Sequence, residues 1–112
     1  EVDTNQKIQT DKIYLIGLGN AVRPIMLKIL SKARKAGLIM EFDSLRRSIK
    51  SQMREANKIG ASLAIIIGDK ELKDKSVQIK DLKKGQQESI PFDSIISYIQ
   101  YSSPRTTILS FN

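Results

Sequence analysis

The stretch Leu63-Ala64-Ile65-Ile66-Ile67-Gly68 decides the fold of this chain. Its apolar residues do not alternate with polar ones, and they are rich in β-branched isoleucine. A strand that is apolar on both faces suits the middle of a parallel sheet, where helices cover both sides. Gly68 then ends the strand. The stretch therefore predicts a central parallel strand in an α/β fold.

On the N-terminal side of this strand, a strand-helix unit is predicted twice. Residues 12–17 form a short β-prone run that leads into a turn. A helix follows with Asn20 as its N-cap, and Gly37 ends it. The apolar residues that recur at helical spacing in this helix are Val22, Ile25, Met26, Ile29, Leu30 and Ala33. Residues 38–42 are a second strand. A second amphipathic helix ends at Gly60, and its apolar positions are Leu45, Ile49, Met53 and Ala56.

On the C-terminal side, the pattern predicts a hairpin. Residues 76–82 partly alternate, with Val77 and Ile79 on one face and Gln78 and Lys80 on the other. Lys84-Gly85 then supplies a turn into a strand at residues 86–90. Both strands are expected to be half-buried, with one polar face.

A closing helix at residues 92–99 completes the predicted order strand-helix-strand-helix-strand-strand-strand-helix. Two consecutive right-handed crossovers predict three parallel strands with helices on both faces, extended at one edge by the hairpin. In such a doubly wound sheet, ligands bind at the carboxyl ends of the parallel strands. These ends fall at residues 17–20, 43–47 and 68–72.

The composition of the 112-residue chain disfavours catalysis, because the chain contains neither Cys nor His. It therefore lacks thiol nucleophiles, imidazole bases and the usual zinc ligands. No apolar run is long enough to cross a bilayer, and the first residues do not resemble a secretory signal. We expect one cytoplasmic, non-catalytic domain at residues 12–100, between a linker at residues 1–11 and a tail at residues 101–112 whose role is unassigned.

The net charge of +7 includes an excess of basic residues around the second predicted helix. Arg46, Lys50, Arg54 and Lys58 are spaced by four, so they form one stripe beside the apolar face. Such a stripe is expected where a polyanion is bound. A solvated helix face kept basic for solubility has the same composition. Charge alone leaves both interpretations open.

Other ligand-binding motifs are incomplete. Gly17-Leu18-Gly19 follows a strand as in dinucleotide-binding folds, but Val22 stands where that fingerprint requires Gly. A phosphate-loop NTPase is excluded because no Gly-Lys-Ser/Thr follows a glycine-rich loop, and the acidic cluster of a receiver domain is missing. Asp69 and Glu71 lie in a predicted lysine-rich loop, where surface ion pairs are the simpler interpretation. The aromatic residues mostly fall in apolar patterns, which does not favour a base-stacking platform.

Four segments at matching spacing resemble one known family. They are residues 47–61, Arg-Ser-Ile-Lys-Ser-Gln-Met-Arg-Glu-Ala-Asn-Lys-Ile-Gly-Ala; residues 65–72, a strand followed by Gly-Asp-Lys-Glu-Leu; residues 77–87, Val-Gln-Ile-Lys-Asp-Leu and then Gly-Gln-Gln; and residues 90–93, Ile-Pro-Phe-Asp. Together they resemble the anticodon-binding domain of bacterial histidyl-tRNA synthetases, which belong to class II. The resemblance covers residues 12–99 and implies a three-layer α/β fold with a five-stranded mixed sheet and three helices.

The resemblance also implies a site that grips tRNA. By similarity to class II relatives, notably threonyl-tRNA synthetases, the residues expected to contact anticodon bases are Glu71, Lys80 and Arg46. Those expected to neutralise backbone phosphates are Arg47, Lys50 and Arg54. A carboxylate accepts from base amino groups, whereas Lys donates to base or phosphate oxygens. The sequence departs from the histidyl pattern at two positions, with Gly17 for the usual Pro and Arg46 for the usual Gly.

The resemblance implies partners as well. A histidine-accepting tRNA is the expected ligand, and the expected parent is a homodimeric histidine-tRNA ligase that uses ATP and Mg²⁺ and has its catalytic domain in the same chain. The domain itself is expected to hold no cofactor and no metal and to contact no membrane. One alternative is a synthetase-derived interaction module, as in a polymerase accessory subunit or a stress-sensing kinase. Another is a small metabolic enzyme that uses the strand-end cleft, for which the catalytic groups are missing.

Overall fold

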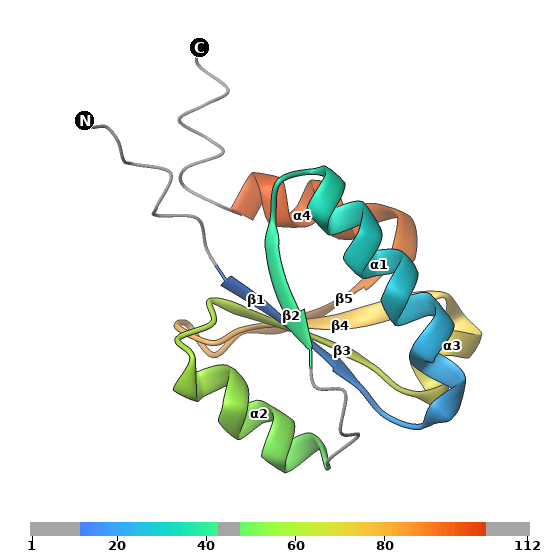
Figure 1. Ribbon diagram of the computed structural model, residues 1–112, viewed down its shortest axis with the longest axis horizontal. Coiled ribbons are helices and arrows are strands. Elements are labelled where there is room, and N and C mark those ends of the chain that lie inside the picture. Colours follow the sequence, from blue (N-terminus) through green and yellow to red (C-terminus); the bar gives the residue numbers. More distant parts are fainter. Residues whose placement is uncertain (1–11, 43–47, 103–112) are drawn as a thin grey trace.

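One mixed sheet of five strands lies at the centre of residues 12–42 and 48–102, the part of the chain that this computed structural model describes (Figure 1). Its order is β2-β1-β3-β4-β5, with bounds β1 (Lys12–Gly17), β2 (Ile39–Phe42), β3 (Leu63–Ile67), β4 (Ser76–Asp81) and β5 (Gln87–Pro91). β1 pairs in parallel with β2 and β3, whereas β3 with β4 and β4 with β5 are antiparallel. This confirms the predicted parallel core with a hairpin at one edge, and β3 is the central strand.

Helices cover both sides of the sheet. The described residues form α1 (Arg23–Lys35), α2 (Ile49–Lys58), α3 (Asp69–Asp74) and α4 (Ile95–Ser102). α1 and α4 lie on one side and α2 on the other, which gives three layers (Figure 1). The three predicted helices are present as α1, α2 and α4, and a fourth, short helix, α3, forms where a loop was expected. α3 has six residues and buries none of them fully, so it leaves no apolar periodicity in the sequence.

The structure shows where α1 and α2 begin, and the start of α1 differs from the one predicted from the sequence. Asn20 opens a 3-10 turn, η2 (Asn20–Val22), and Val22 occupies the N-cap position of α1. The prediction of Asn20 as that N-cap was therefore wrong. α2 begins after Ser48, whose hydroxyl accepts a hydrogen bond from the Ser51 N–H at 3.2 Å. Leu45, expected in this helix, lies outside the described residues.

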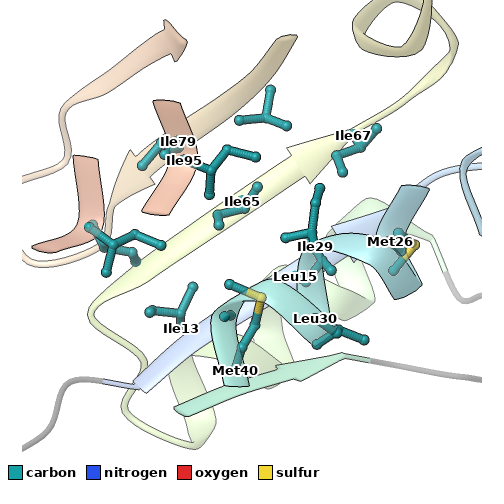
Figure 2. Packing of buried hydrophobic residues seen from close by; sticks show 14 of the residues in the cluster. Ile13, Leu15, Met26, Ile29, Leu30, Met40, Ile65, Ile67, Ile79 and Ile95 are labelled. Carbon is teal, nitrogen blue, oxygen red and sulfur yellow. The ribbon is translucent and has the colours of Figure 1, made fainter. Parts of the chain in front are cut away.

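Alternation along the strands divides the buried side chains between two cores. On the α1 side, Ile13, Leu15, Ile65 and Ile67 pack against α1 and α4 (Figure 2). Val77 and Ile79 of β4 and Ile90 of β5 extend this core, and a 3-10 turn, η3 (Phe92–Ser94), leads into α4. On the α2 side, the buried apolar residues are Tyr14, Ile16, Ala56, Ala61 and Ala64. The hairpin is thus packed on the α1 side, and the core under α2 is smaller.

Candidate nucleic-acid interface

The carboxyl ends of β1 and β3 meet at one rim of the sheet. The Leu18 N–H donates to the Ile67 carbonyl at 2.9 Å. A Cβ built on Gly19 would lie 3.9 Å from Asp69 Oδ1, so the turn after β1 approaches the start of α3. Two of the three predicted strand ends therefore come together. The third, residues 43–47, lies outside the described residues, as do Arg46 and Arg47 within it.

Glu71 is half-buried in the first turn of α3, not in the loop predicted from the sequence. Its Oε1 accepts a hydrogen bond from the Gly68 N–H at 2.7 Å, which satisfies one of the donors left over at a helix start. Negative charge is also favourable at a helix N-terminus. A carboxylate has further acceptor positions, so this structural role is compatible with contact to a base. The predicted role in anticodon contact stays a prediction.

Lys80 is half-buried on β4, opposite Ala64 of β3 and Gln87 of β5. Ala64 precedes Gly68, the N-cap of α3, by four residues, so Lys80 lies roughly 13 Å along the sheet from the rim at about 3.3 Å per residue. Because β4 runs antiparallel to β3, the chain moves away from Glu71 as it approaches Lys80. The structure does not gather these two predicted base-contacting residues at one point.

Around Lys80, polar side chains cover the α2 side of the hairpin. This polar strip consists of Ser76, Gln78 and Lys80 from β4 and Gln87 and Ser89 from β5, and strand alternation places all five on one face. Each is half-buried or exposed, and Gln87 Nε2 donates to Gln78 Oε1 at 3.3 Å. Of the described helices, α2 alone lies on this side, and it packs against β1 and β3 (Figure 1). The polar strip is therefore accessible among the described residues.

α2 carries the basic stripe expected from the sequence, in the three described residues Lys50, Arg54 and Lys58, all of them exposed. The helix starts at the rim, where Gln52 Nε2 donates to the Gly17 carbonyl at 3.1 Å. The chain after α2 reaches the opposite end of the strands, where the Ser62 N–H donates to the carbonyl of Lys12, the first residue of β1. Lys50 to Lys58 spans about 12 Å at 1.5 Å per residue. The basic stripe therefore runs over the same length as the path from Glu71 to Lys80.

The sequence interpretation overlooked a second basic surface. α1 has no acidic residue, and its exposed cations are Arg23, Lys28, Lys32, Arg34 and Lys35. They lie on the opposite side of the sheet from α2 (Figure 1). The absence of Asp and Glu from residues 12–40 was a visible signal of this surface. Three of the five fall in the last turn of α1, where positive charge is favourable at a helix C-terminus, so the surface has a structural explanation of its own.

Within residues 12–42 and 48–102, no group of three or more acidic residues is placed to hold a metal ion. None of the helices in this part is long and apolar enough to cross a membrane. What the described surface offers is hydrogen-bonding side chains beside cations, which is chemistry suited to nucleic-acid loops.

The fold of the described residues is that of a known class of domain. The model of the anticodon binding domain family matches residues 12–101, and the chain belongs to this family.

Similarity to particular proteins narrows the class. The chain is 38% identical over 89 residues to the histidine-tRNA ligase of Pelotomaculum thermopropionicum and 39% identical over 88 residues to that of Symbiobacterium thermophilum. The first match covers 80% of this chain and 21% of the relative, and the second covers 79% and 20%. The apo histidyl-tRNA synthetase of S. aureus superposes with a TM-score of 0.75 at 29% identity, over 88% of this chain and 28% of that one. The chain thus corresponds to the anticodon-binding domain of histidyl-tRNA synthetases and spans about a fifth of the length of these curated relatives.

Proposed function

We propose that this domain binds the anticodon loop of a histidine-accepting tRNA across its α2 side. One observation carries the proposal: the polar strip lies open beside α2, and the basic stripe extends over the same length of the sheet. Phosphate contacts orient RNA without reading sequence, whereas polar groups that reach base edges supply specificity. The two surfaces together offer both kinds of contact.

The individual roles follow from this division. Lys50 and Arg54 neutralise phosphates, together with Arg47 from the segment outside the described residues. Lys80 donates to base or phosphate oxygens from the polar strip. Glu71 contacts a base from the rim, with an oxygen other than the one that caps Gly68. Arg46 is assigned to the anticodon by the resemblance alone.

We also propose that the domain acts within a cytoplasmic, homodimeric histidine-tRNA ligase whose catalytic domain, in the same chain, uses ATP and Mg²⁺. The support is that the similar curated proteins are histidine-tRNA ligases about five times as long as the matched region. In this arrangement the domain selects the tRNA and the catalytic domain joins histidine to it.

The test exploits the two basic helices on opposite sides of the sheet. Binding of the chain to a synthetic anticodon stem-loop is measured over a range of salt concentrations, for wild type, Lys50→Ala and the matched control Lys28→Ala. Both substitutions remove one exposed lysine from a helix. Lys50→Ala is expected to lower the salt slope by about 0.7 to 0.9, the value for one lost phosphate contact, while Lys28→Ala leaves it unchanged.

A second RNA in which the histidine triplet is changed tests base reading. Wild type is expected to prefer the histidine triplet, and Lys80→Ala to reduce that preference by about 1–3 kcal/mol. Equal effects of Lys50→Ala and Lys28→Ala would mean diffuse attraction by net charge rather than a site on the α2 side. Absence of RNA binding by wild type would favour the interaction-module alternative.

A further inference from the structure

α2 is attached to the sheet by few apolar contacts. All ten of its residues are described, and two of them, Gln52 and Ala56, are buried. Met53 is partly buried, as is Ile59, the residue directly after the helix. Ile49 in the first turn is 41% exposed. Because Ile49 is exposed and the buried Ala56 lies toward the end of the helix, hydrophobic burial holds the start of α2 weakly. A different contact has to fix this end of the helix.

Gln52 supplies that contact. Its side chain is 1% exposed, and its Nε2 donates to the Gly17 carbonyl at 3.1 Å. Gly17 ends β1, so the bond joins the first half of α2 to the rim of the sheet. Hydrophobic contact is non-directional, whereas a hydrogen bond requires a particular distance and angle. The bond therefore restricts the rotation of α2 about its axis as well as its distance from the sheet.

The position of Gln52 in the helix determines where the cations point. Lys50 and Arg54 stand two residues before and two after it, and at about 100° per residue each points roughly 160° away from it. When Gln52 faces the sheet, both cations face solvent, as they do here. Since Lys50 and Arg54 are four residues apart, any rotation of the helix moves them together.

We propose that Gln52 is a positioning residue for RNA binding: its hydrogen bond to Gly17 sets the rotation of α2, so that Lys50 and Arg54 meet successive phosphates. The inference rests on the proposed function, because it concerns how the same surface is held. A buried glutamine that merely stabilised the fold would affect the amount of folded protein without changing how the folded protein meets RNA.

A neutral substitution separates these roles. Gln52→Met has nearly the same length and no donor, so it removes the hydrogen bond without changing the charge of the chain. We expect several-fold weaker binding to the anticodon stem-loop and a salt slope shallower by up to about 1.4 to 1.8, the value for two lost phosphate contacts. Gln52→Asn, whose amide is one methylene too short to reach the Gly17 carbonyl from the same helix position, is expected to change both in the same direction. Gln52→Asn replaces Gln52→Met as the test variant if the methionine variant does not fold.

The matched control is Ala56→Gly, which loosens the same helix at a buried position and leaves the Gln52 hydrogen bond in place. All variants are compared at a temperature where circular dichroism shows them folded. A wild-type slope for Gln52→Met or Gln52→Asn, or an equal loss of slope in Ala56→Gly, would overturn the role of Gln52 while the effect of Lys50→Ala stands. Loss of the Lys50→Ala effect itself would overturn the proposed function, and the role of Gln52 with it.

Discussion

At Gly17, a single added methyl group would collide with a side chain of α1, and the resulting loss of stability can be measured. A Cβ built there would lie 2.1 Å from Met26 Sδ, 2.9 Å from Met26 Cε and 3.1 Å from Val22 Cγ2. Gly17 is not among the residues with positive φ, so alanine is compatible with its backbone. The effect of Gly17→Ala is therefore steric, and it falls on one side chain of α1.

The magnitude follows from how far Met26 can move. Its sulfur and terminal methyl are the flexible end of the side chain, but the residue is 7% exposed and belongs to the α1-side core. Overpacking of this kind costs about 1–3 kcal/mol. Met26→Ala removes the obstructing atoms and costs about 2–5 kcal/mol by leaving a cavity. In the double variant the new methyl group enters that cavity, so the double variant should be more stable than the sum of the two losses implies.

The assay is a double-mutant cycle by urea unfolding of wild type, Gly17→Ala, Met26→Ala and the combined variant. We expect a favourable coupling of roughly 0.5–3 kcal/mol, the range for residues in direct contact. Val22→Ala serves as the control, because Val22 Cγ2 is the more distant neighbour and should couple more weakly with Gly17. Strict additivity between positions 17 and 26 would refute the reasoning, since the methyl group would then not be meeting Met26.

Two positions in and after α3 give further tests. Glu71→Ala removes the acceptor of the Gly68 N–H and should lower the free energy of unfolding by about 1 kcal/mol. Glu71→Gln keeps an acceptor and loses only the favourable charge, so its loss should be smaller; equal losses in urea unfolding would argue against the capping role. Lys75 has φ 54° and ψ 45°, a left-handed conformation that costs a non-glycine residue about 1–2 kcal/mol. Lys75→Gly should therefore raise the thermal midpoint, and an unchanged or lower midpoint would contradict that account.

The main elements could be predicted because each has its own apolar pattern. β3 is apolar on both faces and lies mid-sheet, and β4 alternates and has one covered face. α3 has no such pattern. Its start is set instead by the hydrogen bond from the Gly68 N–H to Glu71 and by packing at the end of β3. The role of Asn20 was also missed, because a short polar side chain is typical of a helix N-cap, whereas here Asn20 opens a 3-10 turn before α1.

Topology explains why the two basic helices lie on opposite sides. The connection from β1 to β2 through α1 moves one position toward one edge of the sheet, whereas the connection from β2 to β3 through α2 moves back past β1 toward the other edge. Right-handed crossovers in opposite directions place their helices on opposite faces. This follows once the strand order is known, but helical spacing alone does not supply that order. The charges on α1 and α2 were therefore readable in the sequence, while their separation by the sheet was not.

The candidate site, like the fold, could be predicted from local sequence patterns only in part, because the rest depends on the order of the strands. Alternation in β4 correctly predicted that Gln78 and Lys80 share a face opposite Val77 and Ile79. It did not predict on which side of the sheet this polar face lies, because that depends on α4 packing on the α1 side with Val77, Ile79 and Ile90. Nor did it predict the separation of Glu71 from Lys80, which arises because β4 turns back along β3. Since α2 runs between the same two ends of the strands, an RNA segment that made both proposed contacts, at the rim and at Lys80, would run alongside α2 and its exposed cations.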